Sequence, residues 1–190
     1  MVWGGRRLDA WYQNPDLIDL NGKSLGKSVK DLFPNTEGLT GWVQKLCEWA
    51  NDLPRNEKDL ANLTSFELNH CFLDRIPKEI GNLTNLTSLD LSHNEITKLP
   101  EEIGNLTKLK TLRLYGNQLT ELPKGIGNLT NLELLQLSEN QLTKIPKEIG
   151  NLSNLKELQP SDNQLTKIPK EIGNLSNLKK LYLSDNQITE

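Results

Sequence analysis

A 23-residue period runs through the last two-thirds of the chain and limits what it can fold into. The phrase LTSLDLSHNEITKLPEEIGNLTN and its close copies succeed one another without gaps, beginning at Leu63, Leu86, Leu109, Leu132, Leu155 and, as an incomplete copy, Leu178. Each copy carries more apolar side chains than it could bury alone. Neighbouring copies must therefore stack and share one core, which predicts a solenoid, an architecture that offers extended surfaces rather than catalytic clefts.

Within each copy the pattern predicts two short elements. In the copy that begins at Leu86, Leu89 and Leu91 alternate with polar residues, as in a strand with one buried face. Further on, the segment from Pro100 to Gly104 has proline at a first helical position and glycine where a short helix would stop. Each copy is therefore expected to supply one strand and one short helical or extended segment.

The repeated phrase resembles the leucine-rich repeat pattern, L-x-x-L-x-L-x-x-N/C-x-L. Its 23-residue length and its second half, x-I/L-P-x-x-I-G-N-L, look like the bacterial class and the Ras-suppressor- and Scribble-like class. The resemblance covers residues 63–190, with five full copies and one partial copy, and leaves out residues 1–62. It implies an α/β solenoid: a right-handed coil with a parallel sheet on the concave side and short helical or extended segments on the convex side.

A column of asparagines, replaced by cysteine in the first copy, follows the expected strands. A buried amide at this place can satisfy backbone groups that are left unpaired as the chain turns inward. Cysteine is an accepted alternative there, since it is small, often buried and a weak donor. We therefore interpret the whole column as structural; its members are Cys71, Asn94, Asn117, Asn140, Asn163 and Asn186.

Pro160 breaks the frame, because the other copies have leucine at its place. Proline has no amide hydrogen, and central strands avoid it. Two interpretations stay open. The residue is either a tolerated local flaw that loses one ladder hydrogen bond, or it marks a soft joint between the repeats on either side.

Residues 1–62 differ in composition from the repeats and are interpreted as an N-terminal helical cap. All four tryptophans lie there, and two helices are expected, over about residues 24–33 and 40–51. A cap would cover the end of the core that begins at Leu63 and Phe66, since terminal repeats need such cover. A separate recruitment module that uses the early aromatic residues is the alternative, and disorder of the first 20 or so residues stays open.

Composition narrows the range of functions. The chain carries 22 lysines and arginines against 25 aspartates and glutamates, a net charge of −3. Because neither part of the chain is basic, binding to nucleic acid or to an anionic membrane is not expected. No apolar run approaches the ~18 residues of a membrane span, and no signal peptide is visible. The two cysteines do not suggest a disulfide framework, so a cytoplasmic location is expected, with export by another route left open.

The face of the expected sheet is the place to look for binding residues. The residues beside the strand leucines point outward there and stack from repeat to repeat at about the 4.8 Å strand spacing. Arginine and tyrosine, which are favoured interface anchors, meet a leucine near the middle of this face. The predicted partner-binding residues are Asp90, His93, Arg113, Tyr115, Leu134 and Gln136.

The sequence predicts neither a metal site nor a catalytic site. His70 and His93 are adjacent on the same face and, with Glu67 and Asp90, could hold a metal ion, but zinc sites usually need a fixed third and fourth ligand. A phosphate-binding glycine loop, a nucleophile elbow and a metalloprotease helix are all missing from the sequence. No catalytic residue, metal or cofactor is therefore predicted.

The predicted function is that of a non-enzymatic protein–protein interaction domain, which binds another protein on the concave face. Two alternatives stay open. One is a sensor or autoinhibitory arm of a longer multidomain enzyme, such as a GTPase or a kinase, that continues past Glu190. The other is a structural protein that self-associates through the open end of its last repeat. Regular repeats specify scaffold more strongly than ligand, so the partner's identity does not follow from the sequence.

Overall fold

The computed structural model describes residues 57–189. In this range a short helix, α4 (Glu57–Ala61), is followed by six strands that alternate with five 3₁₀ helices. The strands are β1 (Ser65–Glu67), β2 (Ser88–Asp90), β3 (Thr111–Arg113), β4 (Leu134–Gln136), β5 (Glu157–Gln159) and β6 (Lys180–Leu181). The 3₁₀ helices are η1 (Lys78–Asn82), η2 (Glu101–Asn105), η3 (Lys124–Asn128), η4 (Lys147–Asn151) and η5 (Lys170–Asn174). The two predicted cap helices and the four tryptophans lie outside the described residues.

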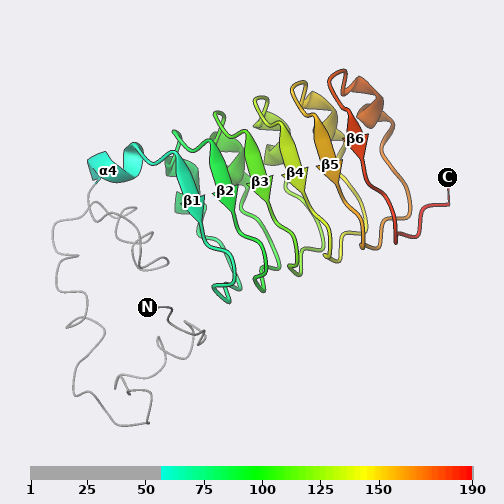
Figure 1. The fold of residues 1–190 in the computed structure, drawn as a ribbon, viewed down its shortest axis with the longest axis horizontal. Helices are drawn as coiled ribbons and strands as arrows, with labels where there is room; N and C mark the ends of the chain where they lie inside the picture. The colour runs from blue at the N-terminus through cyan, green and yellow to red at the C-terminus, as the bar shows by residue number, and fades with distance from the viewer. Residues whose placement is uncertain (1–56, 190) are drawn as a thin grey trace, which may run out of the picture.

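The six strands form one parallel sheet. Each strand pairs with the next in chain order, from β1 to β6, as Figure 1 shows. Each strand residue pairs with the residue one full repeat further along the chain: Leu89 lies opposite Leu112, and Leu112 lies opposite Leu135. A slip of one residue would turn every strand leucine from the core to the solvent, so the alternating pattern itself specifies this register. The predicted solenoid with a parallel sheet is confirmed.

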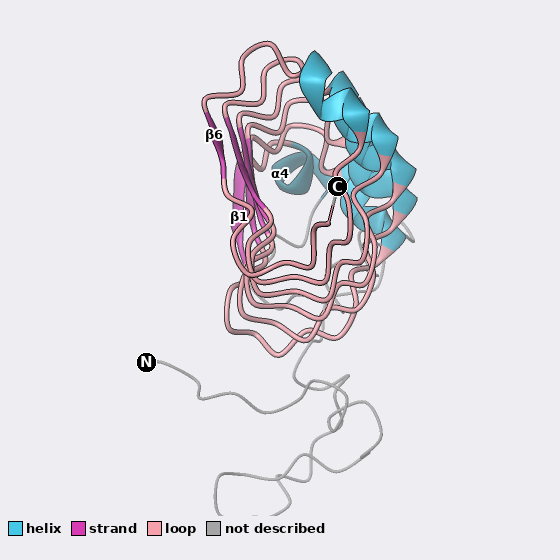
Figure 2. Cartoon of the chain, turned by 90° about the vertical axis from the view of Figure 1, so that its right-hand side faces the viewer, coloured by secondary structure: helices cyan, strands magenta, loops and turns pink. Residues whose placement is uncertain are grey.

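The core lies between the sheet and the 3₁₀ helices. Viewed along the coil, the strands line one side and the helices line the other (Figure 2). Leu112 and Leu135, the middle residues of β3 and β4, have no exposed surface. Ile103 and Ile126 of η2 and η3 belong to the same cluster and are equally buried. Because each fully buried side chain of this size contributes about 1.5–3 kcal/mol, the shared layer is the main stabilising element of the coil.

The 3₁₀ helices correct two details of the expectation from sequence. The sequence predicts proline at the first helical position, whereas Pro100 is the N-cap, with extended backbone angles (φ −70°, ψ 150°). It also predicts that glycine ends the helix, whereas Gly104 lies inside η2, which continues to Asn105. A Cβ on Gly104 would come within 2.4 Å of the carbonyl oxygen of Gly125 in the next repeat. Glycine occurs here because neighbouring helices pack too closely for a side chain.

The two ends of the described coil differ in burial. At the first end α4 lies beside β1, within the outline of the coil, and its Leu60 is fully buried (Figures 1 and 2). At the other end β6 pairs on one side only, and Leu181 and Tyr182 are 37% and 44% exposed. Within residues 57–189, therefore, the core is covered at its first end and open at its last.

No helix in the described part of the chain has both the length and the apolar character needed to cross a bilayer.

Pro160 occupies a buried leucine position without displacing the fold. The equivalent Leu137 donates its amide hydrogen to the Gln159 carbonyl oxygen at 2.8 Å, a bond that proline cannot make. The carbonyl oxygen of Pro160 still accepts hydrogen bonds from the side chains of Asn163 and Asn186, at 3.2 and 2.9 Å. The adjacent strand β6 has two residues instead of three. This geometry agrees with a local flaw, and the soft joint stays a prediction.

Candidate binding site on the sheet face

The outward side of the sheet, here the sheet face, consists of the residues that flank the buried strand leucines and those in the turn after each strand. An open hollow of about 500 Å³ crosses it between the turn after β1 and strand β5. A hollow of this size can take a few side chains of a partner. Its lining includes His70, Asp90, His93, Tyr115, Gln136 and Gln159.

The structure brings together four of the six predicted partner-binding residues. Asp90, His93, Tyr115 and Gln136 all line the hollow. Arg113 lies beside it, with its Nη1 atom 4.0 Å from Asp90 Oδ2. Leu134 is half-buried at the start of β4 and is not part of the lining. The hollow therefore includes the predicted tyrosine anchor but not the predicted leucine.

Three aromatic rings that line the hollow, those of His70, His93 and Tyr115, are here called the aromatic wall. The two histidine rings stack, with their centroids 4.2 Å apart and 13° between their planes. Tyr115 meets His93 edge to face, with the centroids 4.7 Å apart and an angle of 84°. The Tyr115 hydroxyl donates a hydrogen bond to Glu139 Oε1, one repeat further on, at 2.7 Å. The contacts link four successive repeats, so the wall is in place before a partner arrives.

The same hydrogen bond also affects the pKa of Tyr115. Its carboxylate acceptor favours the protonated phenol and so raises the pKa of Tyr115; desolvation and the charges of Glu139 and Asp162 act in the same direction. The hydroxyl therefore remains a neutral donor to Glu139 at neutral pH. The sequence alone gave no sign of this pair, because the two residues are 24 positions apart and occupy different columns.

Left-handed backbone at one place in each repeat orients the aromatic wall. The residues concerned lie three positions after the ends of β1, β2 and β4: φ is 56° at His70, 53° at His93 and 54° at Glu139. The equivalent residue of the third repeat is Gly116, with a φ of 66°. A Cβ on Gly116 would lie 3.0 Å from His93 Nδ1. Glycine thus leaves the space that the His93 ring occupies next to Tyr115.

The sheet face is acidic. It has six carboxylates against two cations, a net charge of −4, whereas the whole chain has a net charge of −3. The excess of acid is therefore concentrated on this face. The carboxylates belong to Glu67, Asp90, Glu139, Glu157, Asp162 and Asp185, and the cations to Arg113 and Lys180.

The two histidines are poorly arranged for a shared metal ion. Their rings stack nearly parallel, so the nitrogen lone pairs, which lie in the ring planes, do not converge on one point. Among residues 57–189, no group of three or more histidine, cysteine, aspartate and glutamate side chains is placed to hold a metal ion.

The asparagine column is buried behind the sheet face and ties the repeats together. Asn117 Oδ1 accepts the amide hydrogen of Ile96 at 3.1 Å, and its Nδ2 donates to the carbonyl oxygens of Leu91 and Leu114 at 2.9 and 3.1 Å. The next two asparagines of the column make the same set of bonds. Each side chain thus satisfies polar backbone groups of its own turn and of the preceding repeat.

Cys71 fills the first place in this column. Its Sγ donates to the carbonyl oxygen of Asn69 at 3.4 Å, and its amide hydrogen goes to Asn94 Oδ1 at 3.1 Å. The following residue, Phe72, has a φ of 57° and is 45% exposed. Among the described residues, positive φ at this place of the repeat is confined to Phe72, so the first turn differs from those that follow.

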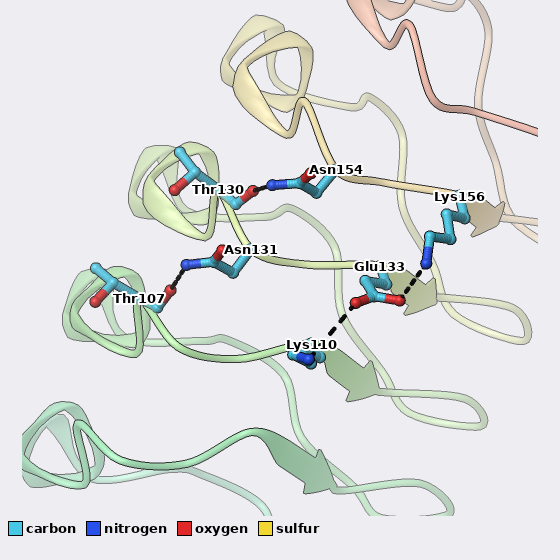
Figure 3. Close-up of polar contacts among 7 residues, drawn as sticks. All are labelled: Thr107, Lys110, Thr130, Asn131, Glu133, Asn154 and Lys156. Carbon is cyan, nitrogen blue, oxygen red and sulfur yellow. Dashed lines mark hydrogen bonds and ion pairs between the residues drawn. The ribbon is translucent and has the colours of Figure 1, made fainter.

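A second asparagine ladder, which the sequence analysis does not identify, runs along the side where the chain enters the strands (Figure 3). Asn131 Nδ2 donates to the carbonyl oxygen of Thr107, and Asn154 Nδ2 donates to that of Thr130, both at 2.8 Å. The signal is present in the sequence, because asparagine recurs just before the leucine that opens each copy. Lys108 interrupts that column and makes it harder to recognise.

A row of alternating charges lies beside this second ladder (Figure 3). Glu133 Oε2 is 2.6 Å from Lys156 Nζ, and Glu133 Oε1 is 3.9 Å from Lys110 Nζ. The hydrogen bond from Lys156 and then its charge lower the pKa of Glu133, and the charge of Lys110 adds to them. Because these side chains are well exposed, water and salt screen the row, and its contribution to stability is small.

Comparison with protein families matches most of the described chain. The model of the leucine-rich repeat region matches residues 49–161, and that of the single leucine-rich repeat matches residues 177–190. The first match begins upstream of residue 63, where the sequence pattern places the first copy. No curated protein matches the chain.

Solved structures of similar proteins share the coil. A leucine-rich repeat protein of Leptospira interrogans is 38% identical, with a TM-score of 0.56, and the match covers 73% of this chain and 41% of that chain. The leucine-rich repeat ectodomain of the Arabidopsis thaliana receptor kinase GASSHO1/SCHENGEN3, in complex with CASPARIAN STRIP INTEGRITY FACTOR 2, is 35% identical, with a TM-score of 0.65 and coverage of 69% and 16%. The PEPR1–AtPEP1 structure is 30% identical, with a TM-score of 0.64 and coverage of 72% and 20%.

The chain spans less than half the length of each of these three proteins. It nevertheless shares the coil with them over 69–73% of its own length. Together with the six-stranded parallel sheet, these matches show that the chain belongs to the leucine-rich repeat family.

Proposed function

We propose that the chain is a non-enzymatic binding module that takes an extended segment of a partner protein across the sheet face. The observation that carries this proposal is the hollow between the turn after β1 and strand β5, lined by polar groups and by the aromatic wall. Tyrosine is among the residues that most often anchor protein interfaces. Tyr115, half-buried and held by Glu139, is therefore the central anchor of the proposed site.

The rigidity of this face favours binding. The histidine stack, the edge contact to Tyr115 and the bond to Glu139 fix the side chains that line the hollow. Also in the lining, Gln136 Nε2 donates to Gln159 Oε1 at 3.1 Å. Side chains that are already ordered lose less conformational entropy when a partner binds. Because this entropy cost is small, a few strong contacts are enough for the sheet face to bind a segment of the partner.

Two of the similar structures support a protein or peptide partner. One holds the GASSHO1/SCHENGEN3 ectodomain with CASPARIAN STRIP INTEGRITY FACTOR 2, and the other pairs PEPR1 with AtPEP1. By analogy, the repeats of this chain supply a binding surface and leave any catalysis to other proteins or domains. The family match does not identify the partner of this chain, because the match reflects the scaffold.

A selection of random peptides displayed on phage tests the proposal. Peptides are selected on the whole chain, and their affinities are measured for the wild type, Tyr115→Ala and Tyr182→Ala. Tyr182 is the matched control, since it is an exposed tyrosine next to β6 and outside the hollow. We expect Tyr115→Ala to weaken binding about tenfold or more and Tyr182→Ala to leave it within about twofold. Peptides that ignore Tyr115 would place the binding surface elsewhere.

A sensor or autoinhibitory arm of a longer protein is the second candidate. The observation that favours it is that the chain spans 41%, 16% and 20% of the three similar proteins, one of which is part of a receptor kinase. The same sheet face would serve in that setting. Expression of the chain within the longest open reading frame that contains it, followed by a comparison of activity with and without a selected peptide, tests this candidate.

Self-association is the third candidate, and the exposed Leu181 and Tyr182 favour it. An edge strand with apolar neighbours readily pairs with another copy or with further chain. Light scattering after size exclusion, over a series of concentrations, tests it. A dimer that Leu181→Lys abolishes would support self-association, and a monomer at every concentration would exclude it.

A further inference from the structure

We propose that the hollow receives a lysine or arginine side chain of the partner segment, with the Asp90 carboxylate as its counter-charge and the aromatic wall against its stem. This inference rests on the proposed function and adds the chemistry of the partner to it. Its basis is the combination, in one hollow, of a carboxylate, an ordered aromatic wall and an acidic surrounding surface.

Charge gives the first argument. Among the residues that line the hollow, with histidine taken as neutral, Asp90 alone carries a formal charge. Glu67 pairs with Asp90 in the sheet register, and Glu139 is bonded to the wall through Tyr115. These three carboxylates would repel an anionic group of the partner, and Arg113 is the nearby cation that could attract it. A cationic group is attracted by all three carboxylates.

The coordination of Asp90 gives the second argument. Its Oδ1 accepts the amide hydrogen of Ser92 at 3.0 Å, which fixes the carboxylate at the end of β2. Its Oδ2 is 4.0 Å from Arg113 Nη1, longer than a hydrogen bond. The Asp90 side chain is 17% exposed and that of Arg113 is 40% exposed. An incoming guanidinium or ammonium group can therefore form a charge-assisted bond to Oδ2 while Arg113 turns toward solvent.

The aromatic wall gives the third argument. Lysine and arginine have long apolar stems, and both carry cations that are attracted to aromatic faces. His93 is stacked on His70 and touched by Tyr115, so the wall keeps its position when a stem packs against it. The amide groups of Gln136 and Gln159, also in the lining, offer further oxygen acceptors to the donors of the cation.

The test uses peptides selected from the displayed library and compares four forms of the chain. The forms are the wild type, Asp90→Asn, Arg113→Gln and Asp162→Asn. Asp90→Asn removes the charge and keeps the shape. Asp162→Asn makes the same change on the sheet face outside the hollow and is the matched control. The selected sequences show which residue types are enriched in the peptides. The affinities show on which charge of the chain the binding of these peptides depends.

We expect lysine or arginine to be enriched at one position of the peptides whose binding depends on Tyr115. Asp90→Asn should weaken those peptides about tenfold or more, and Asp162→Asn should change their affinity less than about threefold. Arg113→Gln removes the competing cation and should raise the affinity of the same peptides about threefold. This gain keeps the test decisive even if Asp90→Asn loses its fold, which the midpoint of urea unfolding would reveal.

The results separate the two proposals. Peptides that depend on Tyr115 but are enriched in aspartate or glutamate, and that Arg113→Gln weakens, overturn the basic anchor and leave the proposed function in place. Equal effects of Asp90→Asn and Asp162→Asn also overturn it, because the charge of the face would then act without the hollow. Failure to obtain any peptide that depends on Tyr115 contradicts the proposed function itself.

Discussion

Glycine recurs in the 3₁₀ helices because adjacent helices touch there. A Cβ on Gly81, Gly127 or Gly150 would lie 2.5–2.6 Å from a carbonyl oxygen of the next repeat. Gly173 has the same place in η5, but a Cβ there would meet nothing within 4 Å. Four similar glycines thus have two different environments, which the repeat sequence does not distinguish.

This difference predicts opposite results for one substitution at two places. Gly127→Ala should lower the free energy of unfolding by about 1–3 kcal/mol, because the added methyl group forces η3 and η4 apart. Gly173→Ala should leave it within about 0.5 kcal/mol, since the methyl group enters open space. The midpoint and slope of urea unfolding measure both changes. Equal destabilisation by the two variants would contradict the close approach of the helices.

The second prediction concerns the row of alternating charges formed by Lys110, Glu133 and Lys156 beside strands β3 to β5. The pKa of the Glu133 carboxyl should lie below its usual range, and Lys156→Met should raise it toward that range, because the hydrogen bond from Lys156 is the largest cause of the shift. Carbon-13 NMR of the carboxyl group during a pH titration measures this directly. Lys144→Met, which removes a separate pair with Glu121, is the control and should leave the titration of Glu133 unchanged.

The sign of the effect on stability follows from the direction of the shift. A carboxyl group whose pKa is lower in the folded chain stabilises the fold above its unfolded-state pKa, and this contribution is lost as the pH falls through the folded value. The Lys156 pair therefore contributes at neutral pH and fades in acid. A titration midpoint for Glu133 that is the same in the wild type and in Lys156→Met would show that the pair does not form in solution.

The junction between β5 and β6 makes a third prediction. Pro160→Leu restores an amide hydrogen that can reach the Tyr182 carbonyl oxygen, as Leu137 reaches that of Gln159. The free energy of unfolding should rise by about 1 kcal/mol, the net value of one hydrogen bond. The reverse change, Leu137→Pro, should lower it by about 3 kcal/mol or more, because it removes a buried leucine as well as a central ladder bond.

Hydrogen exchange at the Asp162 amide separates the two interpretations of Pro160. If proline is a local flaw, Pro160→Leu should slow this exchange by less than about tenfold. A much larger effect, confined to the neighbourhood of residues 158–162, would instead establish the soft joint between the fifth repeat and its neighbours.

At the scale of the whole molecule, each repeat contacts only its neighbours, so stability should vary along the coil. Strands β2, β3 and β4 have fully buried central leucines and a strand on each side. Strand β6 has one neighbour, and its Leu181 is 37% exposed, whereas α4 covers the end at β1 and Phe66 is 7% exposed. Backbone amides of β2 to β4 should therefore exchange slowest, those of β1 next, and those of β6 fastest.

Hydrogen exchange followed by mass spectrometry measures this gradient on the intact chain. Added denaturant should bring the exchange of all strands closer together as global unfolding takes over. Equal protection of β1 and β6 in water would contradict the open last end and would indicate that something covers it in solution.

The repeat sequence by itself determined the solenoid, the parallel register and the buried asparagine column. These depend on local patterns: alternation decides which strand residues are buried, and the constant period fixes which residues of adjacent repeats meet. Asn117, for example, bonds backbone groups whose places the period already specifies. The same logic could have found the second ladder at Asn131, had the break at Lys108 not obscured it.

Only the tertiary structure decided which side chains form the hollow and which of the glycines are needed. The stack of His70 on His93 and the bond from Tyr115 to Glu139 depend on side-chain torsions, and the open space beside Gly116 is needed for that packing. None of these follows from the period, because a repeat specifies the backbone position of a residue but leaves the direction of an exposed side chain free. The neighbours in the adjacent repeats set that direction, and they differ from one repeat to the next.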